Sequence, residues 1–462
     1  MRQTTIAAAV LASCMLAGGV SRAAQPNPLN IKGGASTTLG IYIKDLEADT
    51  VVYFYGDDRA MTPASVTKAF TTASAMTLLG PDYQFETPVY LTGKRNGSAW
   101  DGTLVVRAGG DPTLESRHFE SWGGICDSIA ARLRAMGVDR IEGGVRVDEN
   151  MPEQGPAEQW EIEDVPWSYG AGHFDLNWRD NTFTLSTASG ATEPHVPGLK
   201  VTKLHSRGSS LKRGILSDHL YVYGPRLNRK SNRVRTSMPH PAPVFKYELE
   251  QTLGKAGIEL GRKQYDSDRT TEVYTHRSAP LQQVMRSLML RSDNLFAEGV
   301  LRAMAPDSAR SVAVEREMQL WRDRGIDTES AGIIDGSGLS RGNCFSPRLI
   351  GDVLEYMALH EDSLAYLKLF ALAGVDGTVR SFMADTPLSG RLALKTGSMN
   401  GVQTYAGYAL NEKGSPSHVV VVFANNMRCG RPALRAAISR MLLEQLAAII
   451  PEESSDKTTE QN

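Results

Sequence analysis

Three short motifs, in a fixed order along the chain, constrain its fold more than any other feature. They are Ser65-Val66-Thr67-Lys68, Ser292-Asp293-Asn294 and Lys395-Thr396-Gly397. A serine hydroxyl is a weak nucleophile at its ordinary pKa and needs a base within hydrogen-bond reach. Lys68 follows Ser65 by three positions, which places both side chains on one side of a helix. The set predicts a serine acyl-transfer site, so the fold must gather three distant segments around one cleft.

A long insertion separates the first two motifs. Ser292 follows Ser65 by 227 positions, far more than two neighbouring walls of a cleft require. The segment 97–267 has short strand-like runs at 103–107, 141–147, 182–187 and 220–223, separated by Gly and Pro. The sequence therefore predicts one or two mostly β domains inserted at 97–267.

The flanking segments show strand and helix patterns in alternation. Two β-rich runs at 40–46 and 50–55 predict a hairpin, and β-rich runs recur at 392–395, 404–410 and 418–424. A period of 3.6 residues predicts helices from about 62 to 78 and at 281–290, 294–304, 345–359, 363–372 and 431–450. The last of these is amphipathic and is expected to pack on a sheet rather than on a membrane. These elements assign 24–96 and 268–450 to one motif-bearing domain.

The first residues predict export. Arg2 precedes an apolar stretch at 6–20, and Ser21-Arg22-Ala23 fits a small-x-small cleavage site, so residues 1–23 read as a signal peptide. A second interpretation is a lipobox at 11–14 with a lipidated Cys14, but the apolar run before it is short, which favours cleavage. The polar tail at 451–462 is predicted to be disordered.

Composition narrows the classes of partner. The formal net charge of −2 gives no general attraction to nucleic acid. No later stretch of about 18 apolar residues follows the signal, so membrane contact is expected to be peripheral at most. Cys126, Cys344 and Cys429 have no C-x-x-C spacing, and the histidines form no H-E-x-x-H motif, so no metal or cofactor is predicted. Any disulfide pairing among the three cysteines stays open.

A basic cluster lies inside the insertion. Its members are Arg226, Arg229, Lys230, Arg233 and Arg235. A solvated loop explains the cluster, and contact with an anionic cell-wall polymer is the alternative.

With its three motifs the chain resembles the class C low-molecular-mass penicillin-binding proteins, the D-alanyl-D-alanine carboxypeptidase/endopeptidase family of serine peptidases (S13). Further matching phrases are Gly-Gly-Asp-Pro-Thr-Leu at 109–114, Asp-Gly-Ser-Gly-Leu-Ser-Arg at 335–341 and Gly-Val-Asp-Gly-Thr at 374–378. A long insertion between the first two motifs marks this family. The resemblance implies an α+β fold: a penicillin-binding/β-lactamase-like transpeptidase domain, with an antiparallel sheet flanked by helices, plus mostly β insert domains.

The resemblance also implies catalytic roles. Ser65 would attack the carbonyl of the penultimate D-Ala, and Lys68 would take its proton as a neutral amine. Partial burial and a positive Lys395 would lower the Lys68 pKa. Ser292 would relay the proton to the leaving amine. Asp293 would support its loop.

Substrate contacts follow in the same way. Asn294 would bind the peptide group of the substrate and hold Lys68 in place, while Lys395 and Thr396 would bind the C-terminal carboxylate. Gly397 would leave the strand edge open for the ligand. Backbone N–H groups of Ser65 and Ser398 would form the oxyanion hole.

The insertion offers residues for the side chain of diaminopimelate. The segment 163–170 resembles the family segment in which an acidic residue and, five positions later, an aromatic residue meet that side chain; these positions are Asp164 and Tyr169. Arg341 would meet a carboxylate of the same group. Asn400 stands where relatives can carry Gln, so no contact is assigned to it.

Three functions compete. The first is a periplasmic D,D-carboxypeptidase or D,D-endopeptidase that acts on peptidoglycan stem peptides and is acylated by β-lactam antibiotics. The second is a β-lactamase, which shares the motifs but must hydrolyse its acyl-enzyme fast. The third is a non-catalytic wall-binding protein, which the intact motifs argue against. The oligomeric state stays open.

Overall fold

The structure is a computed structural model of the chain. It describes residues 28, 29, 31, 34, 36–204, 210–214, 220–224, 227–228, 230–265, 267–360 and 363–449. The predicted signal peptide, with the lipobox at Cys14, and the predicted tail lie outside the described residues. So do Arg226 and Arg229 of the basic cluster.

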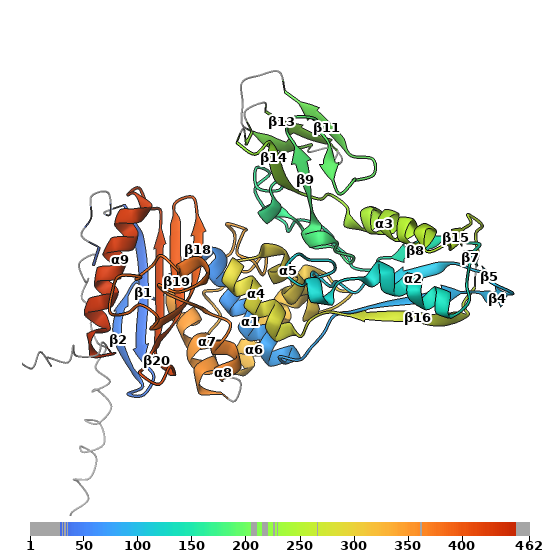
Figure 1. Cartoon of the computed structure of the whole chain (residues 1–462). Helices are drawn as coiled ribbons and strands as arrows, with labels where there is room; N and C mark the ends of the chain where they lie inside the picture. The colour runs from blue at the N-terminus through green and yellow to red at the C-terminus, as the bar shows by residue number, and fades with distance from the viewer. Residues whose placement is uncertain are drawn as a thin grey trace, which may run out of the picture.

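A six-stranded antiparallel sheet forms one end of the molecule (Figure 1), with the order β17-β18-β19-β20-β1-β2. Its strands are β1 (Thr38–Asp45), β2 (Thr50–Tyr55), β17 (Ala371–Leu372), β18 (Leu392–Met399), β19 (Val402–Leu410) and β20 (Pro416–Asn425). The predicted hairpin and the three late β-rich runs are confirmed. Because β1 pairs with β20, the sheet joins the two ends of the described chain.

Helices cover both faces of this sheet. Alternate residues of β20 enter different cores, Val419 and Val421 on one face and Val420 and Val422 on the other, as a strand with a two-residue repeat requires. α9 (Arg431–Gln445) packs on the second face, and the other helices of this domain lie on the side of the first (Figure 1). These are α1 (Thr67–Leu79), α4 (Leu281–Arg291), α5 (Asn294–Ala303), α6 (Arg310–Asp323), α7 (Pro347–Leu359) and α8 (Ser363–Leu367). The helix predicted at 363–372 is shorter, since β17 follows at Ala371.

The chain enters and leaves the insertion through one pair of strands. β3 (Glu86–Thr92) and β16 (Thr270–Arg277) pair antiparallel, and the sheet continues through β6 (Leu104–Arg107) and β8 (Val145–Asp148). A smaller sheet holds β15 (Glu259–Leu260), β7 (Arg140–Ile141), β5 (Ala99–Asp101) and β4 (Lys94–Asn96). Since β3 and β16 belong to the insertion's own sheet, we propose 86–277 as its bounds, wider than the predicted 97–267.

Two helices and a further pair of sheets complete the insertion. α2 (Ile125–Ala135) and α3 (Pro241–Lys255), neither of them predicted, share a core with the first sheets. Farther along the chain lie two three-stranded sheets, β10-β9-β14 and β11-β13-β12, which stand as a separate arm in Figure 1. Their strands are β9 (Thr182–Ser186), β10 (Thr192–Glu193), β11 (Lys200–Lys203), β12 (Leu211–Arg213), β13 (Leu220–Tyr223) and β14 (Arg233–Ser237). The insertion therefore has two parts.

A long irregular segment, 149–181, runs from β8 to β9 and returns to the motif-bearing domain. It contains the short 3-10 turns η3 (Ser168–Gly170) and η4 (Arg179–Asn181). Trp160 and Tyr169 of this segment make hydrogen bonds to residues of the motif-bearing domain. The insertion thus contributes directly to the surroundings of the motifs.

Two global features complete the description. Within the described ranges, no helix has the length and apolar character needed to span a bilayer. Cys126, Cys344 and Cys429 are all free thiols, and Cys126 is buried.

Candidate active site

Ser65 and Lys68 lie at the start of the first buried helix. Ser65 is in the 3-10 turn η1 (Ala64–Val66), and Lys68 is in the first turn of α1, which begins one residue after η1. The Thr67 hydroxyl donates to the carbonyl of Ala64 at 2.9 Å and fixes this turn. Lys68 Nζ donates to Ser65 Oγ at 3.0 Å. The predicted nucleophile and base are therefore in direct contact.

Lys68 is fully buried, and its Nζ contacts three acceptors. Besides Ser65 Oγ, it donates to Asn294 Oδ1 at 2.7 Å and to the carbonyl of Ser337 at 2.5 Å. Burial lowers the pKa of Lys68 to about 8, although the carboxylate of Asp335 acts in the opposite direction. A lysine with such a pKa loses its proton readily near neutral pH and can act as a general base.

Ser292, Asp293 and Asn294 form the turn between α4 and α5, which we call the Ser292 turn. Ser292 ends α4 in the left-handed conformation at φ 59°, and the Asp293 carboxylate caps α5 by accepting from the N–H of Phe296 at 3.1 Å. Asp293 thus supports its turn, the role expected from the resemblance. Asn294 donates from Nδ2 to the carbonyl of Tyr169 at 2.8 Å. With its Oδ1 on Lys68, the Asn294 amide has a fixed orientation.

Lys395 on β18 forms the opposite wall. Its Nζ donates to Ser292 Oγ at 3.0 Å and to the carbonyl of Thr396 at 2.6 Å. Burial and the neighbouring Lys68 lower the pKa of Lys395 well below its usual value. From the resemblance we expected a positively charged Lys395 beside Lys68. In the structure both amines are buried, so protonation of one disfavours protonation of the other. A carboxylate that binds between them would favour their protonated forms.

Gly397 makes a close contact within the protein. A Cβ there would lie 2.1 Å from Thr404 Oγ1, 2.5 Å from the carbonyl oxygen of Pro63 and 3.0 Å from the amide nitrogen of Ser65. The missing side chain therefore makes room for η1, the turn that carries Ser65. This close contact brings β18 beside Ser65, as an oxyanion hole shared by Ser65 and Ser398 requires. Ser398 itself is exposed, and its Oγ donates to Gln403 Oε1 at 3.1 Å.

Two contacts at the site were not anticipated from the motifs. The Thr396 hydroxyl donates to Thr378 Oγ1 at 2.7 Å; Thr378 belongs to the phrase at 374–378 and to the 3-10 turn η5 (Gly377–Val379). The phrase at 335–341 is a turn, as predicted, but Ser337 within it supplies the third acceptor of Lys68. These phrases were visible in the sequence, although the contacts were not.

Two buried carboxylates, those of Asp335 and Glu298, hold the turn at Asp335 by accepting hydrogen bonds from its backbone. Asp335 accepts from the N–H of Gly338 at 2.6 Å and that of Ser340 at 2.7 Å, and from the indole of Trp160 at 2.7 Å. Glu298 of α5 accepts from the N–H of Ser337 at 3.0 Å. Burial raises the pKa of Glu298 to about 7. The carbonyl that meets Lys68 is thus fixed by residues of both domains.

The three residues predicted to meet diaminopimelate, two from the insertion and Arg341 from the motif-bearing domain, lie in two separate contacts. Tyr169 donates from its hydroxyl to Asp164 Oδ1 at 2.8 Å. Arg341 Nε donates to Glu161 Oε1 at 2.5 Å, and Arg341 Nη1 donates to the carbonyl of Asn400 at 3.3 Å. The carboxylate that meets Arg341 here is therefore Glu161, a residue the sequence did not single out.

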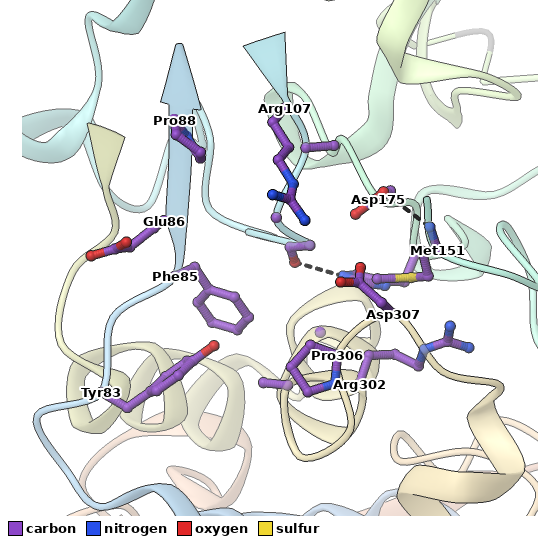
Figure 2. A pocket seen from close by; sticks show the side chains of 16 residues that line it. Tyr83, Phe85, Glu86, Pro88, Arg107, Met151, Asp175, Arg302, Pro306 and Asp307 are labelled. Carbon is purple, nitrogen blue, oxygen red and sulfur yellow. Dashed lines mark hydrogen bonds between the residues drawn. The ribbon is translucent and has the colours of Figure 1, made fainter. Parts of the chain in front are cut away.

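Figure 2 shows a cavity of about 240 Å³ where the insertion meets α5. Tyr83 and Phe85 face Arg302, Pro306 and Asp307 across it, and none of the motif residues lines it. Nε2 of the buried His173 donates to the carbonyl of Gly110 at 2.8 Å, and burial lowers the pKa of His173 to about 3. This cavity marks the junction of two domains. Across the described ranges, His, Cys, Asp and Glu form no group of three that could hold a metal ion.

Comparison with known families and sequences gives a consistent match. The model of the D-Ala-D-Ala carboxypeptidase 3 (S13) family matches residues 30–445. The D-alanyl-D-alanine carboxypeptidase DacB of Haemophilus influenzae is 26% identical over 418 residues, covering 82% of this chain and 83% of that protein. A carboxypeptidase of Mycobacterium tuberculosis is 32% identical over 376 residues, covering 78% of this chain and 70% of that protein.

Solved structures agree with the sequences. The crystal structure of penicillin binding protein 4 (dacB) from Haemophilus influenzae matches with a TM-score of 0.76 at 26% identity, covering 89% of this chain and 96% of that chain. The same protein complexed with a novel beta-lactam matches with a TM-score of 0.71 at 24% identity, over the same shares. The likeness of fold therefore includes the insertion as well as the motif-bearing domain.

Proposed function

The chain belongs to the D-Ala-D-Ala carboxypeptidase 3 (S13) family of serine peptidases, and from this premise we propose that Ser65 is the nucleophile with which it cleaves D-alanyl peptides. It is a serine-type D-Ala-D-Ala carboxypeptidase with the penicillin-binding fold. The observation that carries the assignment of Ser65 is the buried Lys68 amine, 3.0 Å from Ser65 Oγ.

Acylation begins with proton transfer. Neutral Lys68 takes the Ser65 proton while Ser65 Oγ attacks the carbonyl of the penultimate D-Ala. Asn294 Oδ1 and the carbonyl of Ser337 accept from Nζ, so the lone pair of the neutral amine points to the remaining partner, Ser65. The N–H groups of Ser65 and Ser398 would stabilise the oxyanion, an effect worth about 10²–10³ in rate for one donor.

The leaving amine needs a proton. Ser292, whose Oγ lies 3.0 Å from Lys395 Nζ, would relay to this amine the proton that Lys68 took from Ser65, so that Lys68 becomes neutral again. Lys395 and Thr396 would bind the carboxylate next to that amine, in a charge-assisted contact. Water then attacks the acyl-enzyme, with Lys68 again as the base, and the products are the shortened peptide and the released amine. A β-lactam ring mimics the same carbonyl and would leave Ser65 acylated.

The proposed substrates are peptidoglycan stem peptides that end in D-Ala-D-Ala or carry D-Ala-diaminopimelate cross-links. The related Haemophilus protein, solved in complex with a beta-lactam, supports the proposal that β-lactams acylate this chain. Asp164, Tyr169 and Arg341 would form the site for the diaminopimelate side chain, with Asp164 pairing with its ammonium. We propose export through the predicted signal peptide and action in the periplasm.

One experiment separates the three functions. The full-length protein is assayed for turnover of a D-Ala-D-Ala peptide and of benzylpenicillin. A D,D-peptidase turns over the peptide and is trapped by the penicillin, a β-lactamase turns over the penicillin, and a non-catalytic wall-binding protein turns over neither. Rapid penicillin hydrolysis without peptide cleavage would reject the proposed function.

A further inference from the structure

Glu298 is a carboxylate that the proposed mechanism does not use, although it lies close to the base. It stands in the middle of α5, and its side chain is fully buried. Its Oε1 accepts from the N–H of Ser337 at 3.0 Å, and its Oε2 lies 3.3 Å from Nε of Arg310 on α6. Neither Oε2 nor that Nε forms a hydrogen bond within the described residues. Because burial of a carboxylate costs free energy and an ion pair without a hydrogen bond offsets only part of it, stability alone does not explain Glu298.

Ser337 connects Glu298 to the proposed base. The N–H of Ser337 donates to Glu298, and its carbonyl accepts from Lys68 Nζ at 2.5 Å. One residue of the turn therefore separates the carboxylate from the amine. In a buried site the effective dielectric is low, so the charge of one group changes the proton affinity of the other. Burial lowers the pKa of Lys68 to about 8, and Glu298 is one of three carboxylates that oppose this shift.

Charged groups approach this pair from each neighbouring element. Around Lys68 they are the carboxylates of Asp335 and Asp293, which act in the same direction as Glu298, and the second buried amine, Lys395. Around Glu298 they are Asp335, Lys68, Arg302, Arg310 and Glu317. Asp335 fixes the shape of its turn through several N–H groups, and Asp293 caps α5. Glu298 accepts one hydrogen bond from the turn, so its charge can be removed while that contact is kept.

The charge of Glu298 changes in the pH range in which Lys68 also titrates. Burial and the neighbouring Asp335 raise the pKa of Glu298 to about 7, against the effect of Arg310. Above that pH the carboxylate favours the ammonium form of Lys68. Below it the neutral carboxyl no longer does so, and Lys68 gives up its proton more readily. The two titrations are therefore coupled, and the neutral amine persists to lower pH than it would beside a permanent carboxylate.

We propose that Glu298 is a positioning residue for acylation, which holds the Ser337 carbonyl against Lys68 and whose charge sets the fraction of Lys68 that is neutral. This inference rests on the proposed function, in which Lys68 is the base. Glu298 acts through Ser337 and through its charge, and not by contact with the reacting atoms. Its two contributions, the contact and the charge, can be separated by two substitutions.

The first substitution, Glu298→Gln, removes the charge and keeps an oxygen that can accept from Ser337. The rate constant for acylation of the full-length protein by benzylpenicillin is measured by stopped flow from pH 6 to pH 9.5. The midpoint of its rise should move to lower pH by about half a unit, less than a charge in direct contact would produce, because one residue lies between. Below pH 7, where Glu298 of the wild-type protein is largely neutral, the two profiles should converge.

The second substitution, Glu298→Asp, keeps the charge and shortens the side chain. Its acylation should keep the wild-type midpoint, while the plateau rate falls by ~3- to 10-fold because the Ser337 turn is held less firmly. Glu317→Gln is the matched control, the same change at another fully buried glutamate, on α6. Burial raises the pKa of Glu317 well above its usual value, which favours its neutral form, so this variant should keep both the midpoint and the plateau. Unfolding temperatures are measured for all three variants.

A Glu298→Gln profile with the wild-type midpoint would overturn the inference and leave the proposed function intact, since the protein would still be acylated. Equal loss of rate at every pH in both Glu298 variants would overturn it in the same way, because a purely structural residue gives that result. If Glu298→Gln does not fold, the unaltered protein decides: coupling requires its rate to rise less steeply with pH than one titrating group allows, and a rise as steep as that of one group would overturn the inference. A wild-type protein that penicillin does not acylate would reject the proposed function itself.

Discussion

The indole nitrogen of Trp160 donates a 2.7 Å hydrogen bond to Asp335 Oδ2, across the boundary between the insertion and the peptidase domain. Trp160 is 7% exposed and Asp335 is fully buried. Asp335 shapes the turn whose Ser337 carbonyl accepts from Lys68. The insertion therefore helps to position the proposed base, Lys68, in addition to any contact that it makes with substrate.

Trp160→Phe should slow acylation by a penicillin ~10-fold, because a lost donor to a buried carboxylate costs about 1–3 kcal/mol and loosens the turn. The matched control is Trp100→Phe, which removes an indole bond of 2.7 Å to the carbonyl of Thr92 in the distant end of the insertion (Figure 1). The acylation rate and the unfolding temperature are measured for both. If both variants lose stability equally and acylate equally fast, Trp160 has only a structural role.

Ser65→Ala should abolish covalent labelling by a fluorescent penicillin and leave the unfolding temperature nearly unchanged, since Ser65 Oγ contributes one hydrogen bond from Lys68. Lys68→Ala should slow labelling by about 10²–10⁴, the usual value of general-base assistance. Wild-type labelling of the Ser65 variant would mean that another residue is the nucleophile.

The local elements around the motifs could be predicted because each depends on short-range patterns. The hairpin of β1 and β2 and the helices α4, α5 and α7 follow from the spacing of apolar residues and from turn residues. The contact of Trp160 with Asp335 joins positions 175 apart inside a segment without regular structure, so no periodicity indicates it. α2 was missed although Ile125, Ile129 and Leu133 have helical spacing, because the surrounding Gly-rich runs favoured strands.

At the active site, too, the sequence predicted the residues but not their long-range contacts. The sequence predicted which side chains would carry the chemistry, since serine, lysine and asparagine at these spacings have few other uses, and the structure brings Ser65, Lys68 and Asn294 into contact. It could not show what Gly397 packs against, because that depends on how β18 meets η1. Nor could it show that Glu298, a polar residue inside α5, is fully buried beside Ser337.

Acylation should depend on pH through Lys68, whose pKa is about 8. Only the neutral amine accepts the Ser65 proton, and its fraction grows as pH rises. The rate constant for acylation should therefore increase from pH 6, pass its midpoint near pH 8 and level off above about pH 9. Stopped-flow acylation across this range, with unfolding temperatures measured at the same pH values, gives the profile. A rate that is constant from pH 6 to 9 would exclude Lys68 as the titrating base.

Gly397→Ala should lower the acylation rate by about 10² or more, because its Cβ would push β18 away from the turn of Ser65 and such misplacement is costly. Gly254→Ala in α3 is the control, since a Cβ at Gly254 meets nothing within 4 Å. A Gly397 variant that acylates like the wild-type protein would show that the site tolerates this shift.

Asp164→Asn tests whether Asp164 recognises the side chain of diaminopimelate. The substitution keeps an oxygen that can accept from Tyr169 but removes the negative charge, so the local structure should survive. Cleavage of a peptide with a diaminopimelate ammonium should fall about 10-fold, since a charged hydrogen bond is worth ~1.5–3 kcal/mol and partial exposure reduces it. Cleavage of a simple acyl-D-Ala-D-Ala peptide and acylation by benzylpenicillin should hardly change, because neither presents that ammonium. Equal losses on both peptides would instead assign Asp164 to the support of Tyr169, whose carbonyl holds Asn294.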